Sequence, residues 1–358
     1  MFTIEMLPAG VGDALWIEYG DPAHPHRILV DGGLRSTLPA LLAKLQSLPD
    51  DGRIELAVLT HVDNDHVNGL LALMQREDVD LRIDDFWMNG WEHVAPPDAL
   101  GTFEAEQLSR LIQSKGYHWN AAFRRAAIAV PDQGDLPAVA LPGGMRITVL
   151  SPDQNRLRAL APAWEEAIRR LGADEDEGEG EGEEQAPATP PDALGEELDV
   201  EKLAAEAFQE DDAIPNGGSI VLLCEYGGKS LLLAGDAHPS LITESLDRLA
   251  KQRGHLRLKL DAFKVSHHGS KANTSPELLT RIKCPAFLFS SKGTRRQQHP
   301  DKPTIARILA ADPVNPKRLI FNYHSPYNSV WDDNSLKAAY LYETVYPSSG
   351  EGGVVFEV

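Results

Sequence analysis

The sequence predicts an α+β fold in which two mixed β-sheets lie face to face between layers of helices. Two observations support this prediction. Strands open the chain, and strands and helices then alternate in both halves. The apolar runs are short, as in residues 54–59 (IELAVL), which suits buried strands. A chain of 358 residues is long enough to bury the core that such a sandwich needs.

The first half of the chain consists of short apolar segments separated by turn residues. Its elements are predicted, in order, as strands 2–6, 14–19 and 27–30, helix 37–48, strand 54–59, helix 65–75, strand 81–88, helix 102–115, strand 145–150 and helix 154–171. Turns rich in Gly and Pro separate the first three strands.

An acidic segment divides the two halves. Residues 173–212 carry a net charge of −16, which is most of the −20 of the whole chain. Like charges repel, and few apolar residues are present to offset the entropy of ordering, so we expect disorder at 172–199, followed by a short helix at 200–208. The predicted organisation is therefore an N-terminal half (1–171), an acidic insertion (172–212) and a C-terminal half (213–358).

The second half repeats the alternation of strands and helices. Its elements are predicted as strands 219–226 and 230–233, helix 241–252, strand 258–265, helix 276–282, strand 286–289, helix 304–311 and strands 318–321 and 353–358. Gly227-Gly228 suits the tight turn of a hairpin between the first two strands.

Composition excludes several classes of protein. No apolar run approaches the roughly 20 residues that span a membrane, so we expect no membrane partner. The N-terminus lacks the features of a signal peptide, which predicts a cytoplasmic protein. Cys224 and Cys284 lie among apolar residues and provide neither a disulfide framework nor a thiolate metal cluster.

The strongest chemical signal is the sequence Thr60-His61-Val62-Asp63-Asn64-Asp65-His66, which follows a predicted strand and opens a predicted helix. Its two imidazoles and two carboxylates are ligands of Zn²⁺, Mn²⁺ and iron sites. The alternative is a helix start, with Asp63 or Asp65 capping the helix and the histidines solvated.

Other predicted strands also end in Asp or His. Asp31 follows one strand, Asp236 another, and the pair His267-His268 a third. A single such ending is usually a turn. Several endings of this kind, all with side chains that bind metals, indicate that separate strands bring ligands together.

These motifs resemble those of the metallo-β-lactamase-fold hydrolases. The HxHxDH signature of that superfamily corresponds to His61, Asp63, Asp65 and His66. Within it, the chain is most similar to the metallo-β-lactamase domain of ComEC-type competence proteins. The shared motifs are Gly10–Ala14, the HxDxDH variant, Asn216–Ser219, Gly235-Asp236, Lys264–Ser270 and His299-Pro300. The resemblance implies an αββα fold and two divalent metal ions; the membrane channel of competence proteins is absent, so DNA import is not implied.

The sequence departs from the superfamily pattern at two ligands. Asp63 replaces the second His of the signature, and Asn216 stands where the middle metal-binding His is usual. Fewer nitrogen and more oxygen ligands shift the preference from Zn²⁺ toward Mn²⁺, with Mg²⁺ as a third candidate.

The resemblance also implies a role for each residue. Asp65, His66 and His267 would hold one ion, His61 and Asp63 the other, and Asp236 would bridge them. Asp31 would orient a ligand His, while Asp13 would either do the same or cap a turn. Three readings stay open for His268: metal ligand, proton donor or loop residue. His299 would donate a proton or contact phosphate, or else lie on the surface. Ser270 and Lys271 would bind phosphate, or else belong to an exposed polar loop.

The residues themselves indicate metal-assisted hydrolysis, in which Asp65 and the histidines support a metal-activated water. The resemblance to the competence group implies a phosphodiesterase, specifically a nuclease with DNA as its substrate. Two other functions remain open: hydrolysis of small esters, lactones or thioesters, and a catalytically weak interaction module in a defence or toxin system.

Overall fold

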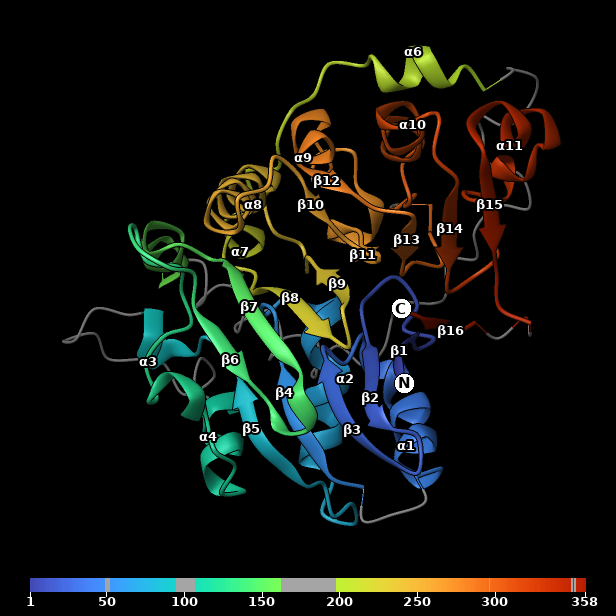
Figure 1. The fold of residues 1–358 in the computed structure, drawn as a ribbon. Helices are drawn as coiled ribbons and strands as arrows, with labels where there is room; N and C mark the ends of the chain where they lie inside the picture. The colour runs from blue at the N-terminus through green and yellow to red at the C-terminus, as the bar shows by residue number, and fades with distance from the viewer. Residues whose placement is uncertain (49–51, 95–106, 162–197, 296, 349, 351) are drawn as a thin grey trace.

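Two β-sheets form the centre of the molecule (Figure 1). The computed structural model describes residues 1–48, 52–94, 107–161, 198–295, 297–348, 350 and 352–358. The first sheet has the order β16 (Val354–Glu357), β1 (Phe2–Met6), β2 (Leu15–Asp21), β3 (His24–Val30), β4 (Ile54–Val58) and β5 (Ile83–Trp87). The second has the order β15 (Tyr342–Val345), β14 (Lys317–Phe321), β13 (Ala286–Phe289), β11 (Ala262–Lys264), β9 (Lys229–Leu233), β8 (Val221–Tyr226), β7 (Arg146–Ser151) and β6 (Ala138–Ala140).

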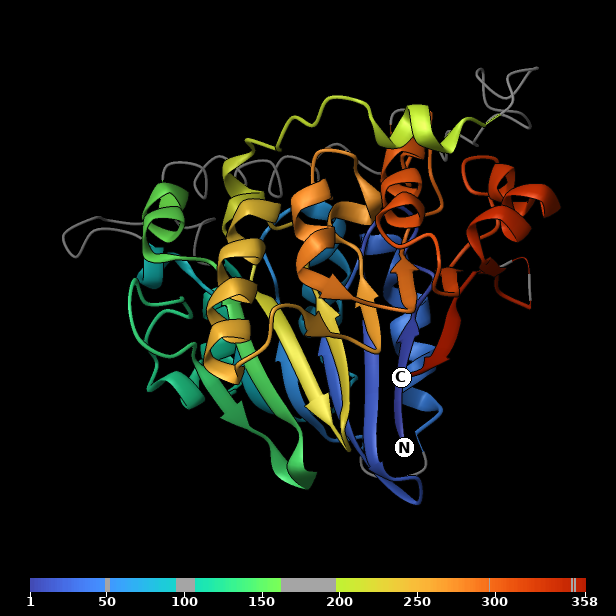
Figure 2. The same ribbon diagram turned by 45° about the horizontal axis from the view of Figure 1, so that its top comes forward.

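Helices cover the outer face of each sheet (Figure 2). On the first sheet lie α1 (Leu38–Gln46), α2 (Asn64–Gln75) and α4 (Gln107–Ser114). On the second lie α8 (Pro239–Arg253), α9 (Pro276–Arg281) and α10 (Lys302–Ala311). Shorter helices are α3 (Trp91–Val94), α6 (Val200–Ala204), α7 (Ile214–Gly217) and α11 (Asn334–Tyr340). This layering confirms the predicted αββα sandwich.

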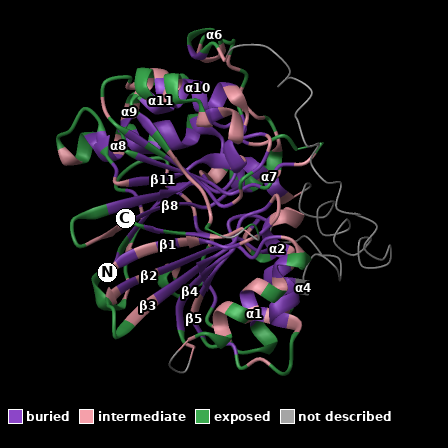
Figure 3. Ribbon diagram, turned by 90° about the vertical axis from the view of Figure 1, so that its right-hand side faces the viewer, coloured by how far each residue is buried: buried purple, intermediate pink, exposed green. Residues whose placement is uncertain are grey.

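The alternation of side chains in the strands produces two layers of core. In β2, Ile17 packs between the sheets, whereas its neighbour Trp16 packs against the helices of the first sheet. Both side chains are buried, as the apolar strand sequence requires. Figure 3 shows buried strands at the centre and exposed residues on the outer surfaces of the helices.

One predicted strand is wrong in its extent. Residues 258–265 form two short strands, β10 (Leu258–Lys259) and β11, because the chain changes partner near Asp261. β10 pairs with β12 (Ile282–Lys283), and β11 pairs with β9 and β13. The Asp261 carboxylate accepts a hydrogen bond from the backbone N–H of Ser230 (2.9 Å), which fixes the change of partner.

The acidic insertion is described only at its C-terminal end. Residues 162–197 lie outside the described residues, so disorder there stays a prediction, as does the end of the helix predicted at 154–171. Residues 198–212 are placed: the short helix expected at 200–208 is present as α6, and it packs against α10. The helix therefore begins where the sequence predicts it, but it ends at Ala204 rather than at residue 208.

Among the described residues, no helix combines the length and hydropathy needed to cross a lipid bilayer.

Candidate metal centre

The carboxyl ends of strands from both sheets meet at one place. β3 and β4 run parallel and end before Asp31 and Thr60, while β9 and β11 run parallel and end before Asp236 and His267. Parallel strands present their carboxyl ends at the same edge of a sheet. The predicted convergence of distant strand ends is therefore confirmed.

The loop after β4, residues 59–66, forms the first wall of the site. The His66 Nδ1 lies 2.9 Å from Asp31 Oδ2, and the Thr60 hydroxyl donates to the same oxygen at 2.8 Å. His61 Nδ1 lies 3.0 Å from that hydroxyl oxygen, to which it donates. One buried carboxylate thus orients both imidazoles, and each directs its Nε2 toward the centre. Asp31 therefore lies behind both imidazoles, and its role in metal binding stays a prediction.

The loop after β11, residues 265–270, forms the second wall. His267 and His268 both have positive φ angles, 49° and 54°, so adjacent side chains can face the same centre. The His267 Nδ1 donates to Asn273 Oδ1 at 3.0 Å, and the His268 Nδ1 donates to the Ser290 carbonyl at 2.9 Å. The two imidazoles are therefore fixed from behind by different partners.

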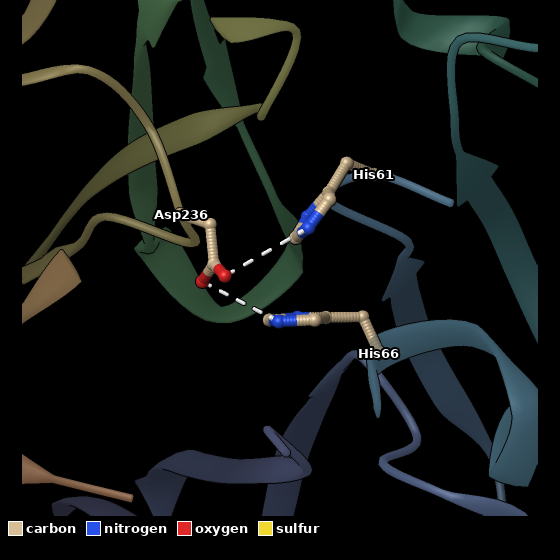
Figure 4. A group of neighbouring side chains, drawn as sticks. All are labelled: His61, His66 and Asp236. Carbon is tan, nitrogen blue, oxygen red and sulfur yellow. Dashed lines mark ion pairs between the residues drawn. The ribbon is translucent and has the colours of Figure 1, made fainter. Parts of the chain in front are cut away.

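Asp236 faces the imidazoles of both walls, and Figure 4 shows it opposite His61 and His66 of the first wall. Its Oδ1 is 3.4 Å from His66 Nε2, and its Oδ2 is 3.9 Å from His61 Nε2. The same Oδ2 is 3.6 Å from His267 Nε2 and 3.7 Å from His268 Nε2. A carboxylate surrounded by four imidazole nitrogens is placed as a bridging ligand would be.

The inward-facing atoms lack hydrogen-bond partners. Among the described residues, the buried atoms His61 Nε2, His66 Nε2, His268 Nε2 and Asp236 Oδ1 form no hydrogen bond. Buried polar atoms are rarely left without a partner, because desolvation is then uncompensated. Imidazole and carboxylate are metal-ligand groups, so a divalent cation fits this arrangement. In the described part of the chain, three sets of three residues converge closely enough to hold one: His61, His66 and Asp236; Asp65, His66 and His268; and Asp13, Asp31 and His66.

The two aspartates of the signature differ in position. Asp65 Oδ2 lies 3.2 Å from His268 Nε2, so it faces the second wall. Asp63 Oδ2 is 3.7 Å from His61 Nε2, and the Asp63 side chain is 37% exposed. Asp63 occupies the N-cap position of α2 but makes no side-chain cap hydrogen bond. The Asp63 side chain therefore does not cap the helix, contrary to the alternative interpretation of this segment.

Charges in this cluster shift the proton equilibria. Burial lowers the pKa of His61 to about 4, with the neighbouring His66 adding to the effect. Burial acts the same way on His66, but Asp236 and Asp31 outweigh it and hold the His66 pKa well above its usual range. Burial, with the charge of Asp65, raises the pKa of Asp63 to about 6. Burial would raise the pKa of Asp236, but the surrounding imidazoles lower it well below its usual range. Without a metal, protons therefore reside on His66 rather than on Asp236.

A buried ion pair lies behind His268 of the second wall. Lys264 Nζ donates to Asp13 Oδ2 at 2.5 Å, and both side chains are fully buried. Asp13 Oδ1 is 3.3 Å from His268 Nδ1. Gly12 lets the backbone that precedes Asp13 lie against the Asp65 backbone, because a Cβ at Gly12 would lie 1.9 Å from the Asp65 carbonyl oxygen. Asp13 thus lies beside His268, and its orienting role stays a prediction.

The remaining predicted residues lie around the second wall. The His299 ring is 5.5 Å from the His267 ring, centroid to centroid. Ser270 is buried and its hydroxyl oxygen accepts from the Ala272 N–H at 3.2 Å, while the Lys271 side chain is exposed. Asn216 Nδ2 is 3.4 Å from His267 Nδ1. Their roles in catalysis and phosphate binding stay predictions.

Sequence reasoning missed the residues that fix the imidazoles of the second wall. Lys264 was part of a quoted motif but had no assigned role. Asn273 follows His267 by six residues with no signal of its own, and Ser290 acts through its backbone carbonyl. Asp211 was counted with the acidic insertion, although its carboxylate lies 3.5 Å from His267 Nδ1. Only packing of the folded chain reveals these contacts.

The family model described as "Metallo-beta-lactamase superfamily" matches residues 25–291. The chain belongs to the metallo-beta-lactamase superfamily. Members of this superfamily are metal-dependent hydrolases. The recognised family and the predicted fold are both confirmed.

Individual relatives match less strongly than the family model. The chain is 32% identical over 90 residues to ComE operon protein 3 of Bacillus subtilis (strain 168), which is 25% of this chain and 11% of that protein's length. Zn²⁺-bound PqqB from Methylobacterium extorquens has a similar structure, with a TM-score of 0.44, 12% identity and coverage of 99% of this chain and 100% of that one. The metallo-beta-lactamase MIM-1 from Novosphingobium pentaromativorans gives a TM-score of 0.28 at 13% identity, with 94% and 83% covered.

Proposed function

We propose that this superfamily member is a metal-dependent phosphodiesterase that hydrolyses DNA. The observation that carries the hydrolytic part of the proposal is the convergence of imidazole Nε2 atoms on Asp236, with buried polar atoms that have no hydrogen-bond partner among the described residues. The site would hold two divalent ions, with Zn²⁺ and Mn²⁺ as the main candidates and Mg²⁺ as the third.

The choice of DNA rests on motifs outside the metal ligands. The chain is similar to the competence group at Gly10–Ala14, Asn216–Ser219 and His299-Pro300 as well as at the metal-binding residues. The partial match to ComE operon protein 3 supports the same choice. It extends over a small part of that protein, so the substrate is proposed here from the motifs and the site together.

The chain's own residues would divide the work of hydrolysis. His61, Asp63, Asp65, His66, Asp236 and the histidine pair would hold the ions. Bound divalent ions supply Lewis acidity and make a water acidic enough to attack at neutral pH. His299 Nδ1 is buried without a hydrogen-bond partner among the described residues, and Asp301 Oδ1 lies 3.6 Å from it. His299 would carry a proton to the leaving oxygen.

The test is cleavage of linear duplex, covalently closed circular and single-stranded DNA by the metal-stripped chain. Mn²⁺, Mg²⁺ or Zn²⁺ is added back separately. Asp65→Ala is the inactivated variant, and Asp80→Ala, which changes an exposed aspartate on a surface turn, is its matched control. We expect cleavage by the wild type and by Asp80→Ala, and none by Asp65→Ala.

The same preparations are assayed with aryl esters, lactones and thioesters. Metal-dependent ester hydrolysis without cleavage of any nucleic acid would refute the proposal and favour a small-molecule hydrolase. Cleavage that persists unchanged in Asp65→Ala would show that a contaminant is responsible.

A further inference from the structure

The segment that follows α6, residues 205–213, runs from α10 to the second wall of the metal centre; we call it the strap. Figure 2 shows α6 above α10 and the strap continuing from it toward α7 and α8. The Phe208 ring lies 5.4 Å from the Arg307 guanidinium on α10. Arg307 also donates to the Glu206 carbonyl at 3.3 Å. The strap is thus attached to the helix layer of the second sheet.

Arg307 connects the strap to the loop that follows the histidine pair. Its Nη1 donates to the carbonyls of Lys271 (2.7 Å) and Thr274 (3.2 Å). Farther along the strap, the Asp211 N–H donates to the Ala272 carbonyl at 3.1 Å. Strap and loop therefore form one hydrogen-bonded unit, although about 60 residues separate them in sequence.

The Asp211 carboxylate accepts hydrogen bonds from both sides of this unit. Its Oδ2 accepts from Asn216 Nδ2 at 2.6 Å and from Asn273 Nδ2 at 2.9 Å, and its Oδ1 accepts from the Ala213 N–H at 3.0 Å. The side chain is 12% exposed. Asn216, which stands where the superfamily usually has a metal-binding His, uses its amide N–H to hold Asp211.

These hydrogen bonds determine the tautomer and the orientation of the His267 imidazole. Asn273 Nδ2 donates to Asp211 and to the Asp236 carbonyl (3.0 Å), so its amide oxygen is the atom left to face His267. That oxygen accepts from His267 Nδ1, which must then carry a hydrogen. The bare Nε2 therefore faces Asp236 Oδ2 at 3.6 Å. A ligand histidine needs this tautomer and this orientation.

We propose that Asp211 is a positioning residue of the metal centre, which orients His267 through Asn273 and so makes the strap part of the site. This inference rests on the metal-binding role of His267 within the proposed function. According to this proposal, the described end of the acidic segment contributes to metal binding, whatever the substrate is.

The experiment measures metal binding without any substrate. Metal-stripped full-length wild type, Asp211→Ala and Asp211→Asn are titrated with Mn²⁺ and with Zn²⁺ by calorimetry. Asp212→Asn is the matched control, because Asp212 is the adjacent residue and is exposed. We expect Asp211→Ala to bind metal about 10–100-fold more weakly, as is typical when a partner behind a ligand is lost. Asp211→Asn should lose less, since an amide oxygen still accepts one of the bonds.

A structural role alone would not change the tautomer of His267. Two-bond ¹H–¹⁵N NMR of the metal-free proteins reports that tautomer, with His267→Gln assigning the signal. We expect the Nδ1–H form in wild type and in Asp212→Asn, and a mixture of tautomers in Asp211→Ala. Should Asp211→Ala fail to fold, as judged by thermal unfolding, Asp211→Asn provides the comparison. Wild-type affinity together with an unchanged tautomer in the folded variant would overturn the proposal, whether or not the protein cleaves DNA.

Discussion

The two walls of the metal centre present the same imidazoles in different ways. In the first wall, His61 and His66 share one carboxylate, Asp31: His66 contacts it directly, and His61 reaches it through the Thr60 hydroxyl. In the second wall, His267 and His268 each have a separate set of partners, drawn from four other segments of the chain. The orienting group of the first wall, Asp31, lies 35 residues before His66 in sequence, whereas the second wall also depends on Asp13 and Asp211, which lie farther from it along the chain.

The difference extends to how charge is balanced. Behind the first wall, the charged orienting group is the Asp31 carboxylate. Behind the second, the Asp13 carboxylate pairs with the buried Lys264. Because an ammonium and a carboxylate are both removed from water, loss of either partner leaves a buried charge uncompensated. We therefore expect variants of the Asp13–Lys264 pair to affect folding, and variants of the first wall to affect mainly metal affinity.

The largest expected effect is that of Lys264→Met. Removing one partner of a fully buried ion pair costs about 3–5 kcal/mol. Chemical denaturation of the metal-free protein should show this loss. The double variant Asp13→Leu/Lys264→Met should regain most of it, since apolar side chains of similar size replace the pair. Equal stability of Lys264→Met and wild type would show that the two walls do not differ in this respect.

Asp31→Ala should have the next largest effect, and on a different property. Both imidazoles of the first wall lose their anchor, so metal affinity should fall about 10–100-fold. The control is Asp85→Ala, in β5 of the same sheet, whose carboxylate accepts from Ala121 and Ala122 away from the site. Calorimetric titration of both variants measures the difference. A similar loss of affinity in Asp85→Ala would mean that the effect arises from the sheet rather than from the wall.

The third prediction concerns protons. Burial alone would lower the pKa of His268, but Asp236 and Asp13 raise it to about 10, and His66 is shifted in the same direction. These imidazoles are therefore protonated at neutral pH without metal, and a cation must displace those protons. Affinity should rise by about tenfold per pH unit for each proton released. Titrations in buffers of different ionisation enthalpy count the protons; a result independent of buffer would contradict the shifts.

The same shift predicts how the metal-free protein responds to pH. The pKa of His268 is higher in the folded protein than in the unfolded chain, so protonated His268 stabilises the fold. This stabilisation is complete below the unfolded pKa of 6.5 and is lost as the pH rises toward 10. Thermal unfolding from pH 6 to pH 10 tests it. His268→Gln should show a weaker dependence over that interval.

Thr60→Val should have the smallest effect. It removes the hydroxyl between His61 and Asp31 and leaves the direct bond of Asp31 to His66 in place. Two hydrogen bonds of the hydroxyl are lost, and only the one with His61 acts directly on a ligand; the loss of one such bond costs about 1 kcal/mol, or about fivefold in metal affinity. A loss as large as that of Asp31→Ala would show that the first wall acts as a single unit.

Much of the fold was predictable because local pattern determines it. The strands that end at Val30 and Val58 have short apolar runs that are typical of buried strands. Gly227-Gly228 predicted the hairpin between β8 and β9, where both glycines have positive φ angles. Short elements such as β6, α7 and β15 were not predicted, because three or four residues show no period. The break between β10 and β11 was missed since a change of strand partner is a tertiary event.

The site divides in the same way. Residues 60–66 carry their own signal, because ligands and orienting groups are adjacent to a strand end. Asp211 carries none: in sequence it is one more acid in an acidic segment. Its separation from His267 by 55 intervening residues means that only folding shows the contact.

The separation of the two walls along the chain has a consequence for synthesis. Some 200 residues lie between His66 and Asn273, so the first wall leaves the ribosome well before its counterpart exists. At about 5–20 residues per second, translation of that stretch takes on the order of ten seconds or more. A nascent chain that exposes only His61 to His66 lacks the central Asp236, and the ion can be acquired only late, once both sheets have docked.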